Sequence, residues 1–240
     1  MKKLSKIVSV ILLCSIFIYS SNIFTKDIIE AQAASNIRLS DSSLVLELGH
    51  YKTLKVSGTS SKVTWSTSNS WIADVTSGGK VTAKAAGTAT ITAKVNGKKL
   101  TCKVTVLRQK NKNLTLKPKD SFNLKIEGTS SKISWNSSNP SVAKVDANGK
   151  VTAVAVGTAT INATVSGKTI SSQVNVVDIN SKSILMEVGG FSGYTYYLKV
   201  NNAPGKITWT SSNPSVATVA SDGTVSAKGY GQATITATVD

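Results

Sequence analysis

Apolar and polar residues alternate with a period of two through long stretches of the chain. Residues 87–95 read GTATITAKV, so that Ala, Ile, Ala and Val alternate with Thr and Lys, and residues 157–165 and 231–239 repeat this order. Side chains of a β-strand point alternately to its two faces, so each run buries one face and exposes the other. No stretch of comparable length has the spacing of an amphipathic helix. The pattern predicts an all-β chain.

Residues suited to tight turns separate these runs. The pairs Asn96-Gly97 and Ser166-Gly167 stand between two alternating runs, as expected for two-residue hairpin turns. A second turn ends in Gly79, Gly149 and Gly223 in successive parts of the chain, and glycine tolerates the positive φ of such turns. Short strands separated by regular turn signals are typical of antiparallel β-sandwiches.

One block of sequence occurs three times. Its copies are WSTSNSWIADV at 65–75, WNSSNPSVAKV at 135–145 and WTSSNPSVATV at 209–219, and an alternating run begins 22 residues after the Trp in each. Matches of this length indicate tandem duplication. We therefore expect three sandwiches, named here the first module (36–107), the second module (108–177) and the third module (178–240).

The repeated tryptophans are the largest side chains of each copy. Trp65, Trp135 and Trp209 each lie between a β-branched strand and a polar turn. We predict that each ring fills the space between the two sheets of its module and forms its structural core. A domain of this size has little buried surface to spare, so the ring should matter to its stability.

The third copy stops at Asp240, where the first two copies continue through a turn into one more strand. We expect the last strand of the third module to be missing, which would leave an unpaired sheet edge. Either the chain is a fragment of a larger protein or something else supplies the strand. Truncation is the interpretation that we favour.

The first residues have the pattern of an export signal. Residues 1–6 are basic, residues 7–20 are apolar, and Ala31-Gln32-Ala33 offers a cleavage site before Ala34. We predict a signal peptide at 1–33 and a secreted, cell-surface or cell-wall-associated protein. The alternative is an uncleaved anchor, which would be the chain's one contact with the membrane. Cleavage would leave Cys102 as the single cysteine, expected to be a buried small hydrophobe, with an intermolecular disulfide as the alternative.

Positive charge is the strongest functional signal in the composition. The chain has 28 Lys and Arg against 12 Asp and Glu, a net charge of +16. Candidate polyanion-binding residues gather near the end of the first module: Lys98, Lys99, Lys103, Arg108, Lys110 and Lys112. For an exported chain the expected polyanions are cell-wall polymers or acidic glycans. The alternative is a solvated basic surface, and no recognition-helix pattern suggests nucleic acid.

A second candidate surface is aromatic. Phe191, Tyr194, Tyr196 and Tyr197 lie in residues 189–197, the region of the third copy that contains its four extra residues. They could form a contact patch for a sugar or a protein. The interpretation that we prefer is a bulged strand that packs against its own module.

Catalytic and metal-binding patterns are weak. His50 is the chain's single histidine and has no ligand partner at a suitable spacing. Ser77-Gly78-Gly79-Lys80 matches the S-x-x-K pattern of some acyl-transfer enzymes, but it occupies a turn that lacks this pattern in the other copies. Asp146–Gly149 has too few neighbouring acids for a calcium loop. We expect no cofactor, no metal and no enzymatic activity.

The repeated motif resembles the bacterial immunoglobulin-like group 2 domain. The resemblance rests on W-x-S/T-S-N-P-S-V-A followed by G-x-A-x-I-x-A, and the first copy departs from it at Ser70-Trp71. It implies sandwiches like those of intimin- and invasin-type adhesins, displayed outside the cell. The expected function is a spacer or adhesion stalk, with a host surface protein as one expected partner. The alternative is a module that binds carbohydrate or anionic cell-wall polymer directly.

Overall fold

The computed structural model describes residues 36–188 and 194–240. The predicted signal peptide and Phe191 lie outside the described residues. Within them every regular element is a β-strand, so the prediction of an all-β chain is confirmed. No helix in these ranges is long and apolar enough to cross a membrane. The chain divides into two compact units, the first ending at Arg108 and the second beginning at Gln109.

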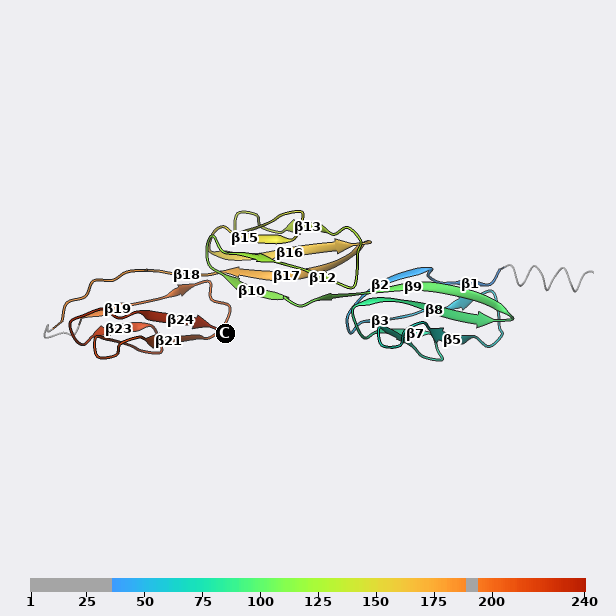
Figure 1. Ribbon diagram of the computed structural model, residues 1–240, viewed down its shortest axis with the longest axis horizontal. Coiled ribbons are helices and arrows are strands. Elements are labelled where there is room, and N and C mark those ends of the chain that lie inside the picture. The colour runs from blue at the N-terminus through green and yellow to red at the C-terminus, as the bar shows by residue number, and fades with distance from the viewer. Residues whose placement is uncertain (1–35, 189–193) are drawn as a thin grey trace, which may run out of the picture. The chain divides into compact units, whose positions relative to one another are not determined.

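The first unit is a sandwich of two sheets (Figure 1). Its strands are β1 (Arg38–Leu39), β2 (Ser43–Glu47), β3 (Tyr51–Thr53), β4 (Val56–Ser57), β5 (Thr64–Thr67), β6 (Ala73–Val75), β7 (Lys80–Ala83), β8 (Gly87–Val95) and β9 (Lys98–Gln109). One sheet has the order β2-β9-β8-β5 and another β3-β7-β6, while β1 pairs with β4. The strand pairs are antiparallel apart from β2 and β9, which run parallel.

The core of the first unit lies between these sheets. Leu54 and Val81 contribute from one side, and Ile91 and Val104 from the other, all of them fully buried. Along β8 the apolar residues are buried and the Thr and Lys residues face outward, as the alternation predicts. Apolar burial on one face of each strand is therefore what holds the two layers together.

The second module repeats this arrangement within the second unit. Its strands are β10 (Asn113–Leu116), β11 (Ser121–Asn123), β12 (Ile126–Glu127), β13 (Ser134–Ser137), β14 (Ala143–Val145), β15 (Lys150–Ala153), β16 (Gly157–Val165) and β17 (Lys168–Val176). The sheets have the orders β10-β17-β16-β13 and β11-β15-β14, and β10 runs parallel to β17. The core is again aliphatic.

The remaining strands belong to the third module. They are β18 (Asp178–Ile179), β19 (Thr195–Tyr197), β20 (Val200–Asn201), β21 (Ile207–Ser211), β22 (Ala217–Val219), β23 (Thr224–Ala227) and β24 (Ile235–Val239). They pair as β18-β20, β19-β23-β22 and β21-β24. Among the described residues, β24 therefore has one neighbour where β8 and β16 have two. The module boundary at residues 177/178 stays a prediction, because the two compact units divide only at 108/109.

The expected turns are present. Gly79, Gly149 and Gly223 have φ of +79°, +84° and +93° and close the hairpins that precede β7, β15 and β23. Asn96-Gly97 and Ser166-Gly167 also have positive φ at both residues. The turn predictions are confirmed. Two-residue turns of this kind occur in hairpins because their backbone twist matches the twist of the strands they join.

The repeated tryptophans lie at the border of the core. Trp65, Trp135 and Trp209 are half-buried, and the first two pack against the buried clusters of their modules. The fully buried centre consists of aliphatic side chains such as Leu54, and Leu124 in the second module. Each indole thus covers the core from one side, where the hairpin-turn glycine leaves room for the ring.

Candidate functional site

The six predicted basic residues belong to different units. Lys98, Lys99, Lys103 and Arg108 are in the first unit, whereas Lys110 and Lys112 are in the second. Lys98 Nζ donates a hydrogen bond to the carbonyl of Ile37 at 3.2 Å. Lys110 Nζ forms an ion pair with Glu127 Oε1 at 2.8 Å. Within the first unit, β9 places Lys99 and Lys103 of the predicted set on one exposed face.

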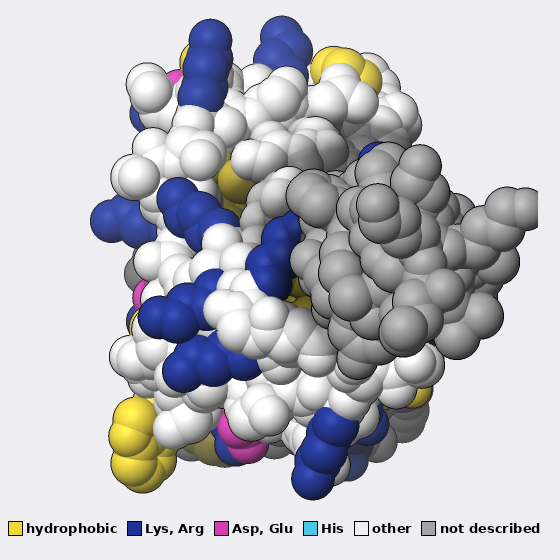
Figure 2. Space-filling view, turned by 90° about the vertical axis from the view of Figure 1, so that its right-hand side faces the viewer, with side chains coloured by type: hydrophobic (Ala, Val, Ile, Leu, Met, Phe, Trp, Pro, Cys, Tyr) yellow, Lys and Arg dark blue, Asp and Glu magenta, His cyan; other side chains and the backbone are white. Residues whose placement is uncertain are grey.

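Three lysines share the outward face of the β8–β9 hairpin. Lys99 and Lys103 are exposed at alternate positions of β9, and Lys94 of β8 lies directly opposite Lys99 in the register. Figure 2 shows several Lys and Arg side chains, and few acidic ones, on the side of the molecule that it presents. Like charges opposite each other in a sheet are destabilising. This group, named here the lysine face, consists of Lys94, Lys99 and Lys103.

Lys94 is absent from the residues predicted from sequence. The Asn96-Gly97 turn was recognised, and a two-residue turn pairs the residues that flank it symmetrically. Counting outward from it places Lys94 opposite Lys99, as the structure shows. The signal was therefore in the sequence, but clustering along the chain does not reveal pairing across strands.

The second module carries no lysine face on the same framework. Thr164 and Thr169 occupy the paired positions of Lys94 and Lys99, and their hydroxyl oxygens are 3.0 Å apart. Gln173 stands at the position of Lys103, opposite Thr160. The fold therefore does not require lysine at these places, and the charge distinguishes one module from the other.

The predicted aromatic cluster is partly exposed. Tyr194 and Tyr197 are 47% and 55% exposed, while Tyr196 is half-buried in β19; Phe191 lies outside the described residues. Tyr197 therefore faces solvent from β19, which pairs with β23, and Tyr194 directly precedes this strand. Tyr230, 90% exposed, is another aromatic residue of the third module and was missed from sequence.

The first unit also exposes aromatic rings. Trp71 is 84% exposed, and it stands where the other copies have Ser141 and Ser215. Tyr51 is exposed as well, and Lys80 Nζ lies 4.0 Å from the centre of its ring. The sequence did mark Trp71 as unusual, because the first copy departs from the repeated motif at Ser70-Trp71.

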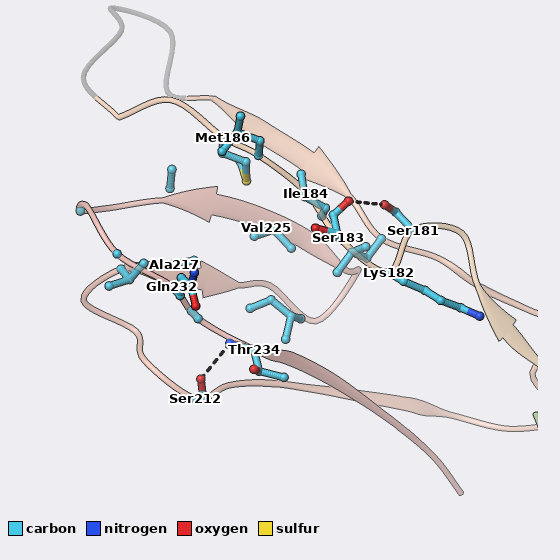
Figure 3. Close-up of a pocket in the computed structure, with 18 of the residues that line it drawn as sticks. Ser181, Lys182, Ser183, Ile184, Met186, Ser212, Ala217, Val225, Gln232 and Thr234 are labelled. Atoms are coloured by element: carbon cyan, nitrogen blue, oxygen red, sulfur yellow. Dashed lines mark hydrogen bonds between the residues drawn. The ribbon is translucent and has the colours of Figure 1, made fainter.

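A groove of about 680 Å³ opens in the third module (Figure 3). Its lining mixes apolar residues such as Ile184, Met186 and Val225 with polar ones such as Gln232 and Thr234. The segment 183–188 forms one side of the groove and the chain leading into β24 forms the other. Val225 and Ile235 of this lining correspond to Val81 and Ile91 of the core of the first module.

Two of the turns weighed for catalysis or metal binding are closed by hydrogen bonds of their own residues. Gly79 N–H donates to the carbonyl of Thr76 at 2.9 Å in the turn that contains the S-x-x-K pattern. Asp146 Oδ1 accepts the N–H groups of Asn148 and Lys150 at 2.8 and 2.9 Å, which closes the equivalent turn. In the described ranges no three His, Cys, Asp or Glu residues gather in a metal-binding group.

Cys102 is completely buried in the core cluster of the first unit. Burial, with a smaller contribution from the negative charge of Asp41, raises the pKa of its thiol to about 11. The prediction of a buried small hydrophobe is confirmed, and the thiol remains protonated at neutral pH.

Comparison with known families matches most of the chain. The family profile described as bacterial Ig-like domain (group 2) matches residues 33–106 and 173–240. The profile described as intimin, immunoglobulin-like domain, matches residues 119–167. An uncharacterized protein of Clostridium acetobutylicum is 36% identical over 118 residues, which cover 45% of this chain and 12% of that protein. The matched part of the chain therefore covers about an eighth of this relative.

Similar solved structures include intimin and an S-layer protein. An intimin mutant of EHEC O157:H7 is 32% identical, with 28% of this chain and 39% of that chain covered and a TM-score of 0.25. A 282-residue C-terminal intimin fragment, solved in complex with the intimin-binding domain of the translocated intimin receptor, is 20% identical. There the coverage is 62% of this chain and 67% of that chain, with a TM-score of 0.38. Domains 4 and 5 of the S-layer protein SbsC are 20% identical, covering 52% and 80%, with a TM-score of 0.25.

Proposed function

Since this chain belongs to the bacterial immunoglobulin-like group 2 family, we propose that it is a non-enzymatic cell-surface protein whose tandem modules form a spacer or adhesion stalk. The observation that carries the proposal is the repetition of one sandwich framework along the chain. Each of the first two modules buries an aliphatic core between sheets, and the polar groups of its loops are used in turns. Repeating the same module lengthens the chain without adding a new kind of functional site.

The mechanical basis of such a role is the strand pairing. The β8–β9 and β16–β17 ladders each join nine residue pairs, and each continues into further strands on both sides. The connections between modules, Leu107–Lys112 and Val177–Lys182, are not the Gly/Ser-rich sequences of flexible tethers. Modules of this kind suit a role in holding a binding end away from a surface.

Surface display and binding are tested separately. An epitope tag inserted at the exposed Asn96-Gly97 turn should be labelled on intact bacteria and removed by external protease. A pure spacer then binds neither purified cell wall nor a glycan array nor host cells. Tag that is detected only after lysis would contradict the proposal.

A second candidate function is direct binding of an anionic cell-wall polymer by the lysine face. Lys94 and Lys99 repel each other across the hairpin, and the second module shows that threonines serve the same framework. A feature that costs stability and is not needed for folding points to a ligand of opposite charge. Such attraction is electrostatic, so salt should weaken it.

The second module provides the matched variant for this test. The triple substitution Lys94→Thr, Lys99→Thr and Lys103→Gln converts the lysine face to the residues of the second module. A control with Lys125→Thr, Lys132→Thr and Lys144→Gln removes the same charge from exposed sites of the second unit. Binding to purified wall should fall several-fold in the first variant and much less in the control. If both variants lose binding equally, net charge alone explains the loss. That result would contradict a specific binding site on the lysine face.

A further inference from the structure

The sheet β3-β7-β6 of the first unit carries a row of three side chains on its outer face. Tyr51 of β3 lies opposite Thr82 of β7, and Thr82 lies opposite Asp74 of β6. Residues directly opposite each other project from the same face of a sheet. This face is the outer one, because Val81 and Ala83, which flank Thr82 along β7, are buried in the core. Figure 1 shows β3 and β7 in the layer opposite β9, so the row is separate from the lysine face.

Lysine side chains contact both ends of this row. Lys80 Nζ lies 4.0 Å from the centre of the Tyr51 ring, which is still 63% exposed. Lys84 Nζ forms an ion pair with Asp74 Oδ2 at 2.6 Å, and both side chains remain accessible to solvent. The hydrogen bond from Lys84 lowers the pKa of the Asp74 carboxyl, which is therefore ionised at neutral pH. The row thus has an aromatic ring at one end and a paired carboxylate and ammonium group at the other.

A second exposed ring stands near the ion pair. Trp71 is 84% exposed and lies in the loop that leads into β6. The carbonyl of Ile72, the next residue, accepts the N–H of Lys84 at 2.8 Å. The backbone that carries the indole therefore adjoins the Asp74–Lys84 ion pair.

The loop that carries Trp71 is fixed by its own hydrogen bonds and by packing. Asn69 Oδ1 accepts the N–H of Trp71 at 3.0 Å, and the carbonyl of Asn69 accepts those of Ile72 and Ala73 at 3.2 and 3.1 Å. The side chain of Ile72 packs on Gly87, where an added Cβ atom would be 2.8 Å from Ile72 Cδ1. A ring on a fixed loop loses little conformational freedom when it binds a ligand.

The other two modules have neither ring nor carboxylate at the corresponding positions. The residues that replace Tyr51, Asp74 and Trp71 are Ser121, Lys144 and Ser141 in the second module and Thr195, Thr218 and Ser215 in the third. The same framework therefore folds without these groups. Folding does not account for their combination in the first module.

We propose that this surface binds an uncharged oligosaccharide. The surface, named here the aromatic face, consists of Tyr51, Trp71, Asp74, Lys80, Thr82 and Lys84. A sugar ring has an apolar face of C–H groups, which packs against an aromatic ring, and hydroxyl groups around its edge. These hydroxyl groups donate hydrogen bonds to a carboxylate and accept them from an ammonium group or a threonine. The site adds a binding function to the spacer role and lies on a different sheet from the lysine face.

The chemistry of the aromatic face favours a neutral sugar over other ligands. The centre of a protein–protein interface is depleted of charged residues, whereas Thr82 and the Asp74–Lys84 pair stand between the two rings. Covering an ion pair with apolar protein surface is costly, while sugar hydroxyl groups can replace the water around it. The carboxylate of Asp74 would also repel a polyanion.

A glycan array of neutral and sialylated oligosaccharides tests the proposal on the full chain. We expect neutral members to be bound, and the same soluble oligosaccharide to bind one to one in titration calorimetry. Binding should persist at high ionic strength, because no net charge of the ligand is involved. Binding should also protect the exposed Trp71 from a fluorescence quencher. An array on which no neutral oligosaccharide is bound would overturn the proposal, and so would binding that high salt abolishes.

The sister modules provide matched variants. Tyr51→Ser and Trp71→Ser introduce the residues of the second module, and each should weaken binding of the oligosaccharide about tenfold, because a stacking surface is lost. Tyr230→Ser removes a 90% exposed ring of the third module and should leave the affinity unchanged. The thermal midpoints of all three variants should stay near that of the original chain, since the rings are exposed. If neither Tyr51→Ser nor Trp71→Ser weakens binding, or if Tyr230→Ser weakens it equally, the proposal is wrong.

The competing ligand is a protein. Host cells or purified walls that retain the full chain can be treated with periodate, which cleaves the vicinal diols of sugars, or with protease. Retention that depends on Trp71 and is lost after periodate supports the proposal. Retention that depends on Trp71 and is lost only after protease would overturn it in favour of a protein partner.

Discussion

The indole of Trp135 lies directly against the backbone of Gly149. A Cβ atom at Gly149 would be 2.7 Å from Cζ2 of Trp135 and 2.8 Å from the carbonyl oxygen of Leu124, and the residue has a φ of +84°. The other two modules repeat this contact between ring and turn. The hairpin turn and the repeated tryptophan are therefore parts of one structural element.

Gly149→Ala should destabilise the second unit by about 3 kcal/mol, because it adds a steric clash to an unfavourable backbone conformation. Gly167 is the matched control, since it has a similar φ of +80° but a Cβ added there would meet no atom within 4 Å. Gly167→Ala should cost roughly 1–2 kcal/mol, the conformational part alone. Urea denaturation of the two variants measures the difference. Equal losses would show that the contact with Trp135 contributes nothing.

Trp135→Ala should unfold the second module or destabilise it by about 3 kcal/mol, near the lower end for loss of a large core side chain, because the ring is only half-buried. Trp71→Ala is the control, since that ring is 84% exposed. Its effect should stay within about 0.5 kcal/mol. Hydrogen exchange of β16 amides reports on the module itself, and unchanged protection in Trp135→Ala would refute the core assignment.

Gln109→Leu should stabilise the second unit by about 1 kcal/mol. Within the described residues, Gln109 Oε1 is buried and has no hydrogen-bond partner, which is costly. Leu39 occupies the corresponding position of the first module. Ser172 Oγ would still donate to the carbonyl of Asn111 at 2.6 Å. The measurement is the thermal midpoint, and a lower midpoint for Gln109→Leu would contradict this account.

Ser172→Ala is the complementary control for this polar pair. It removes the hydroxyl that accepts a hydrogen bond from Gln109 Nε2, so it should lower the thermal midpoint while Gln109→Leu raises it.

Lys94→Thr should leave the first unit as stable as before or raise its stability by about 0.2–1 kcal/mol, because it relieves repulsion across the hairpin. Since both lysines are exposed, salt should stabilise the original chain more than the variant. Thermal unfolding at low and high ionic strength measures this. A clear loss of stability at low salt would mean that Lys94 has a structural role.

Cys102 should resist alkylation at neutral pH in the folded chain and react only after unfolding, because it is buried and its pKa is raised to about 11. The ordinary value is 9.0, so the unfolded chain loses the thiol proton at lower pH than the folded chain. The stability that Cys102 contributes is therefore complete below pH 9.0 and declines as pH rises toward about 11. Across this pH range, the free energy of unfolding from denaturation curves should fall less with rising pH in Cys102→Ala than in the original chain. A thiol reagent that labels the folded chain at neutral pH would contradict the burial.

The sequence-based predictions that the structure confirms rest on local patterns of residues and on the repetition of the module. Alternation predicted which side chains of β8 and β16 are buried, because a strand's two faces meet different environments. Gly79 and Gly149 marked turns because few other residues adopt positive φ there. The family followed from a motif repeated at one spacing. Each of these features depends on residues that are close along the chain.

By itself, then, the sequence determined an all-β chain of repeated immunoglobulin-like modules, their turns and the burial of Cys102. Tertiary structure alone decided that β2 runs parallel to β9, that aliphatic residues rather than Trp65 occupy the centre of the core, and that a groove remains beside β24. The physical reason is distance along the chain. Each of these features arises where segments tens of residues apart meet, and alternation within a single strand does not specify its neighbours.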